Sequence, residues 1–155
     1  MTDAFVRAAA KPKIRPRAQC GALPWRPDGA LEILLITSRE TGRWVIPKGW
    51  PMKGKSAPAA AAIEAYEEAG LVGEIAKEAV GSYAYVKFRR TGRGQPCKVK
   101  VFPMRVLAQR EEWPEKGQRI LQWFPWPEAA AAVQERQLAR LIRKFAKRAA
   151  KAAKG

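Results

Sequence analysis

The stretch Trp44–Leu71, WVIPKGWPMKGKSAPAAAAIEAYEEAGL, decides how this chain folds and which chemistry it carries. Its glutamates Glu64, Glu67 and Glu68 have the spacing i, i+3, i+4, which places three carboxylates on one face of a helix. Carboxylates this close repel one another, and a hard divalent cation such as Mg²⁺ would relieve the repulsion by binding their oxygens. Clustered glutamates can equally form a solvated acidic face, and the spacing alone leaves both interpretations open.

The helix that carries these glutamates has start and stop signals in the sequence. Ser56 fits the N-cap, and Pro58 lies in the first turn, where its missing N–H costs nothing. Alanines and other good helix formers follow, and Gly70 stands where a helix ends in the left-handed conformation. The sequence therefore predicts a helix over residues 57–69.

The loop and helix together resemble the signature of the Nudix hydrolases, G-x5-E-x7-R-E-U-x-E-E-x-G-U, where U is a bulky aliphatic residue. The matching positions are Gly49, Glu64, Glu67, Glu68, Gly70 and Leu71. Lys55 and Ile63 replace the first glutamate and the arginine, and Ala65 is a small version of the aliphatic residue. In the family the replaced pair helps to hold loop and helix together, so the loss of one partner alone would strand a charge. Because both are changed here, we expect re-use of the loop rather than decay.

The resemblance implies an α/β fold, the Nudix-type α/β/α sandwich with a mixed sheet, the box helix and a C-terminal helix. It also implies a metal-dependent pyrophosphohydrolase, with Mg²⁺ as the cofactor and Mn²⁺ as an alternative. Glu67, Glu68 and the backbone carbonyl of Lys48 would bind the metal. Glu64 would be a further ligand, or the group that orients or deprotonates water. The chain has no histidine, so acid–base chemistry falls to carboxylates, lysines, tyrosines or metal-bound water.

Residues 109–128 resemble the branch of the family that cleaves diphosphoinositol polyphosphates and diadenosine polyphosphates. The residues that carry this resemblance are Glu111, Glu112, Trp113, Trp123 and Phe124. Many Nudix enzymes take an additional carboxylate from this part of the chain, which makes Glu112, or else Glu111, a candidate catalytic residue. A merely solvated loop glutamate is the competing interpretation.

The chain is strongly basic, with 30 Lys and Arg against 14 Asp and Glu among 155 residues, a net charge of +16. Such a charge predicts a polyanionic partner: a phosphate-rich small substrate, nucleic acid or a membrane surface. The candidate phosphate-binding residues are Arg43, Lys48, Lys53, Lys55, Lys87 and Arg89. On the predicted hairpin, Lys87, Lys98 and Lys100 are expected on the polar face, where they are either solvated or line a basic trough over the substrate.

The elements around the box suit one domain over residues 18–150, preceded by a basic flexible arm (1–17) and followed by a basic tail (151–155). Strands are predicted at 18–25, 31–37, 43–47, 80–88, 97–107 and 120–124, and a last helix at 128–150. That helix has an apolar stripe typical of a core and, from Arg136 onward, eight basic residues and no acid. No RNA-recognition motif accompanies them, so nucleic-acid binding is only a generic expectation.

Cys20 and Cys97 match no metal-ligand spacing and are expected to be buried and reduced. With no signal peptide and no apolar run long enough to span a bilayer, the sequence predicts a cytoplasmic protein without membrane attachment. It does not specify the oligomeric state. Two functions remain open: a pyrophosphohydrolase acting on a polyphosphorylated small molecule, and a binding module for RNA or a phosphorylated ligand with little turnover.

Overall fold

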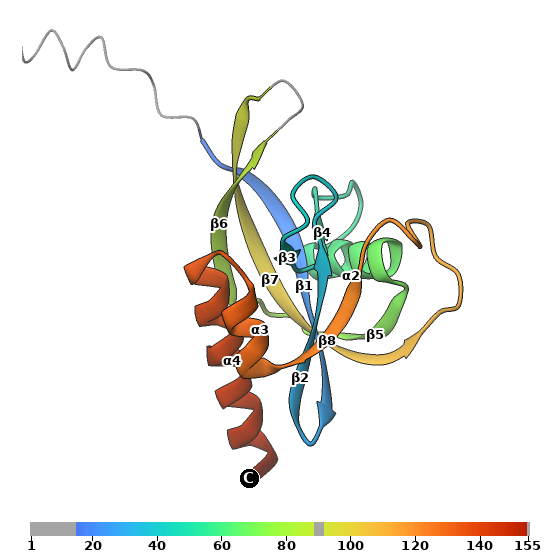
Figure 1. Ribbon diagram of the computed structural model, residues 1–155, viewed down its shortest axis with the longest axis vertical. Helices are drawn as coiled ribbons and strands as arrows, with labels where there is room; N and C mark the ends of the chain where they lie inside the picture. Colours follow the sequence, from blue (N-terminus) through green and yellow to red (C-terminus); the bar gives the residue numbers. More distant parts are fainter. Residues whose placement is uncertain (1–14, 89–91, 155) are drawn as a thin grey trace, which may run out of the picture.

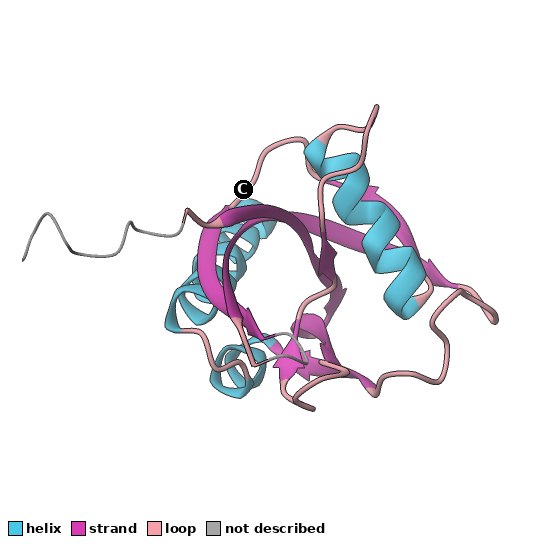
Figure 2. Ribbon diagram, turned by 90° about the horizontal axis from the view of Figure 1, so that it is seen from above, coloured by secondary structure: helices cyan, strands magenta, loops and turns pink. Residues whose placement is uncertain are grey.

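The computed structural model describes residues 15–88 and 92–154, and one curved sheet forms its centre (Figure 1). The strands are β1 (Arg17–Asp28), β2 (Ala30–Thr37), β3 (Trp44–Val45), β4 (Lys48–Gly49), β5 (Leu71–Ile75), β6 (Gly81–Phe88), β7 (Gly94–Gln109) and β8 (Leu121–Pro125). The helices are α2 (Ala57–Ala69), α3 (Trp126–Ala132) and α4 (Arg136–Lys154). Figure 2 shows α2 on one side of the curved sheet and the other two helices on the opposite side.

The sheet is mixed, with a main path β3-β2-β1-β7-β5; β4 pairs with β1, β6 with β7 and β8 with β2. Only the β1–β7 pairing is parallel among the described strands, with Arg17 opposite Cys97 and Trp25 opposite Arg105. Parallel neighbours need a crossover connection, usually helical, and the segment between β1 and β7 contains α2. The predicted α/β/α sandwich is therefore confirmed.

Two apolar cores fill the spaces between the sheet and its helices. Leu23 and Ile33 belong to the core under α3 and α4, whereas their neighbours Ala22 and Leu34 belong to the core under α2. Successive residues of a strand point to opposite faces, so β1 and β2 are covered on both sides. This explains why the predicted strand at 31–37 is an almost continuous aliphatic run.

Helix α2 spans 57–69, as predicted. The Ser56 hydroxyl accepts a hydrogen bond from the Ala59 N–H (3.2 Å), and Gly70 ends the helix with φ 71° while its N–H reaches Tyr66 O (2.8 Å). Four alanines of α2 pack in the core against the sheet; Ala60, Ala61, Ala65 and Ala69 are at most 1 % exposed. Small side chains let the helix lie close to the sheet, and this position brings Glu68 within hydrogen-bond distance of the box loop.

Four elements, β1, β5, α3 and α4, differ from the sequence predictions. β5 directly follows α2 and was not predicted, because LVGEI is short and contains a glycine at the position where its pairing with β7 shifts register. The single helix predicted at 128–150 is two helices, α3 and α4, separated at Val133 by extended backbone. α4 continues to Lys154 and so includes most of the segment predicted as a tail, whereas β1 begins at Arg17, inside the predicted arm. The rest of that arm, residues 1–14, lies outside the described residues.

Candidate active site

The box loop, defined as Lys48–Lys55, is anchored beside α2 by short backbone pairing. Its first two residues form β4 and pair with Cys20 and Gly21 of β1. The carboxylate of Glu64 lies directly against Gly49, and a β-carbon at position 49 would overlap it. The first glycine of the signature thus leaves room for the Glu64 carboxylate against the loop backbone.

Glu68 is the most deeply placed of the three box glutamates, with 5 % of its surface exposed. One carboxylate oxygen accepts a hydrogen bond from the Lys48 N–H (3.3 Å), and the other lies 3.5 Å from Nη2 of Arg119. Glu68 therefore ties the box loop to α2 and is paired with a cation from the segment before β8.

Burial and mutual repulsion raise the pKa values of two of these carboxyls. Burial, followed by the charges of Glu67 and Glu115, raises the pKa of Glu64 to about 7. Burial raises the pKa of Glu68 to about 8; Arg119 and Lys48 act in the opposite direction, and Glu64 adds to the increase. Such raised values are typical of groups poised for proton transfer or for binding a cation.

The donor set suits a hard divalent cation. Glu67 is half-buried, and its spacing places it on the same helix face as Glu64 and Glu68, beside the box loop. Within residues 15–88 and 92–154, no three acidic, cysteine or histidine side chains already converge as a preformed cage. Mg²⁺ does not need such a cage, since it commonly binds one or two carboxylates and completes its shell with water and substrate phosphates. Burial is the main cause of the two raised pKa values, and repulsion between neighbouring carboxylates adds to it; a bound cation would offset both effects.

The loop before β8 contributes two groups that the sequence did not single out. The Glu115 N–H donates to the carbonyl of Glu67 (3.0 Å), and its carboxylate lies 3.1 Å from Arg119. Arg119 is 9 % exposed and also donates to the carbonyl of Thr37 (3.1 Å). The predicted Glu112 is instead 86 % exposed and pairs with Lys116 at 3.2 Å. The sequence signal was the E-x3-R spacing 115–119, which is common on any loop and therefore weak.

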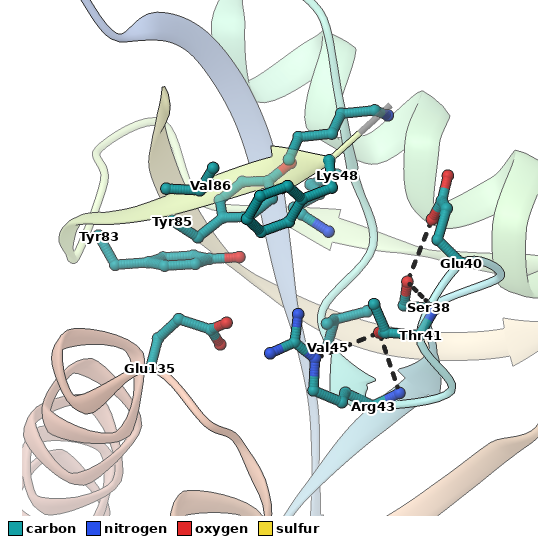
Figure 3. Close-up of a pocket in the computed structure, with 12 residues that line it drawn as sticks. Ser38, Glu40, Thr41, Arg43, Val45, Lys48, Tyr83, Tyr85, Val86 and Glu135 are labelled. Atoms are coloured by element: carbon teal, nitrogen blue, oxygen red, sulfur yellow. Dashed lines mark hydrogen bonds between the residues drawn. The ribbon is translucent and has the colours of Figure 1, made fainter. Parts of the chain in front are cut away.

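A pocket opens on the other side of the box loop, between β6, the β2–β3 turn and the start of α4 (Figure 3). Its lining includes Arg43, Lys48, Lys87, Tyr83, Tyr85 and Glu135. The Lys48 ammonium lies 4.9 Å from the centre of the Tyr85 ring, and burial lowers the pKa of Lys48. Lys48 thus contacts Glu68 through its backbone and the pocket through its side chain, so it connects the two.

The predicted phosphate-binding residues fall into three groups. Arg43, Lys48 and Lys87 line the pocket together, whereas Lys53 and Lys55 are exposed on the box loop. Arg89 lies outside the described residues.

The interpretation of the hairpin lysines as one polar face is wrong. Lys87 follows Tyr85 by two residues along β6, so both side chains point to the face of the sheet that lines the pocket. Lys98 of β7 pairs with Ala84, whose side chain points to the other face. Lys100 shares that second face, because side chains alternate along a strand.

The family can be assigned at this point, because the box loop, the glutamate helix and the mixed sheet agree with a comparison of the whole chain. The model of the NUDIX domain matches residues 15–148. The chain belongs to the Nudix family. The predicted enzyme class, a Nudix-type pyrophosphohydrolase, is confirmed by this match and by the relatives below.

Among similar Nudix proteins, Nudix hydrolase 21 (chloroplastic) of Arabidopsis thaliana is 31 % identical over 137 residues, covering 85 % of this chain and 67 % of the relative. Nudix hydrolase 12 (mitochondrial) of the same plant is 28 % identical over 118 residues, covering 74 % of this chain and 58 % of the relative. The chain spans about two thirds of the first relative's length and less of the second's.

Solved structures agree with the fold. A Caenorhabditis elegans Ap4A hydrolase binary complex has a TM-score of 0.64 at 20 % identity, covering 87 % of this chain and 98 % of that one. The NUDIX domain of Shewanella oneidensis NrtR, complexed with ADP ribose, has a TM-score of 0.63 at 16 % identity, covering 96 % of this chain and 99 % of that one.

The two departures from the Nudix signature have structural counterparts. Ile63 lines a shallow groove on the outer side of α2 with Tyr66 and Leu71, and Lys55 is exposed. The Glu68–Lys48 hydrogen bond joins the box loop to α2. Arg119 connects the same Glu68 to Glu115 and to the carbonyl of Thr37.

Two further predictions concern the thiols and membrane helices. Cys20 and Cys97 are buried free thiols, as expected. In the part of the chain that the structure describes, no helix has the length and apolar character needed to cross a bilayer.

Proposed function

We propose that this Nudix protein is a metal-dependent hydrolase that cleaves a pyrophosphate bond in a phosphate-rich substrate of the diphosphoinositol polyphosphate or dinucleoside polyphosphate type. The observation that carries the proposal is the geometry of the box: the Glu64 carboxylate lies against Gly49, and Glu68 is hydrogen-bonded to the Lys48 N–H. Burial raises the pKa values of both carboxyls, and the neighbouring pocket is lined by Arg43, Lys48 and Lys87 together with Glu40 and Glu135. Similarity of fold to an Ap4A hydrolase supports the dinucleoside type.

A pyrophosphate link is already anionic, so a nucleophile must approach a negatively charged phosphorus. Bound Mg²⁺, or Mn²⁺ as the alternative, would neutralise phosphate oxygens and lower the pKa of bound water. The residues assigned to hold it are Glu67, Glu68 and the carbonyl of Lys48, with Glu64 as a further ligand.

The chain's own groups have separable tasks in this proposal. Glu64, with a pKa of about 7, exchanges a proton readily near neutral pH and is suited to orient or deprotonate the attacking water. Glu68 is fixed by the Lys48 N–H, so its second oxygen keeps a defined direction. Arg119 offsets part of the negative charge and lowers the pKa of Glu68 toward the ionised form.

Phosphates away from the cleaved bond would be bound by the basic residues of the pocket and loop. Arg43 can hold a phosphate with two hydrogen bonds, while Lys48 and Lys87 act as point charges. Lys53 and Lys55, which are exposed on the box loop, would reach outer phosphates of a longer substrate. Arg89 is assigned the same task from the sequence.

The test is phosphate release from diphosphoinositol and dinucleoside polyphosphates with Mg²⁺ or Mn²⁺, comparing the wild type with Glu68→Gln. We expect turnover to fall about 100-fold or more, because an amide binds the cation far more weakly than a carboxylate. Glu78→Gln, an exposed glutamate outside the site, is the matched control and should retain turnover. Near-normal turnover of a folded Glu68→Gln protein would refute the assignment.

The same assay decides which loop carboxylate contributes. Glu112→Gln tests the group expected from the sequence, and Glu115→Gln tests the group whose charge acts on both Glu64 and Glu68. If only the second variant loses turnover, the additional carboxylate is Glu115.

A second candidate is a binding module on a Nudix scaffold for RNA or a phosphorylated ligand, with little turnover. Lys55 and Ile63 in place of the signature's glutamate and arginine favour it. A folded protein that binds polyanions but cleaves none of the substrates would support it. For either function we infer a cytoplasmic protein, a prediction that fractionation can test.

A further inference from the structure

Helix α4 carries a row of cations that the proposed hydrolase chemistry does not use. We define the α4 ridge as Arg136, Arg140, Arg143, Lys144, Lys147 and Lys151, all of which are exposed. At 3.6 residues per turn these six lie within an arc of about 100°, and they extend along about 22 Å of helix. The ridge is therefore one continuous strip of positive charge.

No ridge cation forms an ion pair among residues 15–88 and 92–153. The sequence of α4 itself contains no Asp or Glu. Most members of the ridge have another cation three or four positions away, a spacing at which like charges repel. Arg148 is excluded from the ridge because it lines a groove with Glu74 and Glu78.

The opposite side of α4 cannot contact a partner, because it packs in the core. Leu138, Leu141, Ile142 and Phe145 are at most 8 % exposed. At the edge of the ridge, the Lys144 ammonium donates to the carbonyl of Val80 (3.0 Å), which ties the helix to the start of β6 and leaves the other five ridge cations for a partner. An amphipathic helix binds a membrane by inserting its apolar face. Because the apolar face is buried in the core here, a partner of α4 can contact only the guanidinium and ammonium groups of the ridge.

A nucleic-acid duplex fits a rigid strip of this length and charge. Each strand presents one phosphate per about 3.4 Å of axis, so about 22 Å spans roughly six phosphates, similar to the number of ridge cations. A small polyphosphate is too short to contact the whole strip. The ridge also lies on the side of the sheet opposite α2 and its glutamates (Figures 1 and 2), so both surfaces can be used at once.

We propose that the α4 ridge binds the phosphodiester backbone of a nucleic-acid duplex, without reading its sequence. The proposal concerns a surface outside the candidate active site. Its success or failure is therefore independent of the pyrophosphohydrolase proposal.

The experiment measures binding of the full chain to a fluorescent 20-base-pair DNA duplex by anisotropy between 50 and 300 mM salt. The ridge variant combines Arg140→Gln, Arg143→Gln, Lys147→Gln and Lys151→Gln. The control removes the same charge at four exposed positions elsewhere, with glutamine at Lys77, Arg93, Lys98 and Arg110. Glutamine is a good helix former, which suits the ridge variant, and the four control positions are exposed residues outside the helices. We therefore expect both proteins to fold, and thermal unfolding checks this.

We expect the ridge variant to bind about 100-fold more weakly at low salt and to lose about 3.6 from the slope of log K against log salt, at about 0.9 per phosphate contact. The control should stay within about threefold of the wild type. Equal weakening of both proteins would overturn the proposal, because only net charge would then matter. Ridge-dependent binding to vesicles containing an anionic lipid, without duplex binding, would overturn it in favour of a membrane surface. If the fourfold variant unfolds, the pair Arg143→Gln and Lys147→Gln gives the same test at half the slope change.

Discussion

Replacement of Arg119 by methionine tests whether the cation from the loop before β8 holds the glutamate cluster together. The side chain is 9 % exposed, and its Nη2 lies 3.5 Å from Glu68 and 3.1 Å from Glu115. Its Nη1 donates to the carbonyl of Thr37 (3.1 Å). Methionine keeps the unbranched length but removes the charge and all three contacts.

The size of the effect follows from the burial of the partners. Removal of one member of a buried ion pair costs about 3–5 kcal/mol. Glu68 has a pKa of about 8 and can take up a proton at pH 7, while Glu115 is 23 % exposed and keeps Arg39 as a partner. Both facts limit the loss, so we expect the free energy of unfolding to fall by about 2 kcal/mol at pH 7, below the range for a fully ionised buried pair.

Urea denaturation of the metal-free protein measures this loss. Arg39→Met is the matched control, because Arg39 lies 3.5 Å from the same Glu115 but its side chain is 51 % exposed. Exposed pairs contribute about 0–1 kcal/mol, so the control should lose no more than that. A loss below about 1 kcal/mol for Arg119→Met, or a loss equal to the control's, would show that Arg119 does not hold the cluster.

Two further predictions concern the same cluster. Gly49→Ala would push the Glu64 carboxylate aside. Because this group is the free end of a flexible side chain, the unfolding free energy should change little, whereas turnover should fall about tenfold or more. Unchanged turnover would contradict the close contact between Gly49 and Glu64. The folded protein holds protons on Glu64 and Glu68 up to pKa values of about 7 and 8, well above the unfolded value. Metal-free stability should therefore decrease as pH rises from about 4.5 to 8. Added Mg²⁺ should raise Tm at pH 8 but not at pH 5, and an equal Tm shift at both pH values would argue against binding by these carboxyls.

Much of the box helix could be predicted because its signals are local. Ser56, Pro58 and Gly70 act within one turn of themselves, and the helix has the predicted bounds. The break between α3 and α4 was missed because the apolar spacing continues through Val133, which is buried in either arrangement. β5 was missed for a related reason: its five residues become a strand by pairing with β7.

The candidate site divides in the same way. The sequence by itself determined the family and the three glutamates of one helix face, since both depend on residues close together along the chain. Only the tertiary structure decided that Arg119 lies beside Glu68 and that Lys87 faces the pocket while Lys98 faces away. The first depends on a contact across 51 positions, and the second on strand register, where a shift of one residue moves every side chain to the other face.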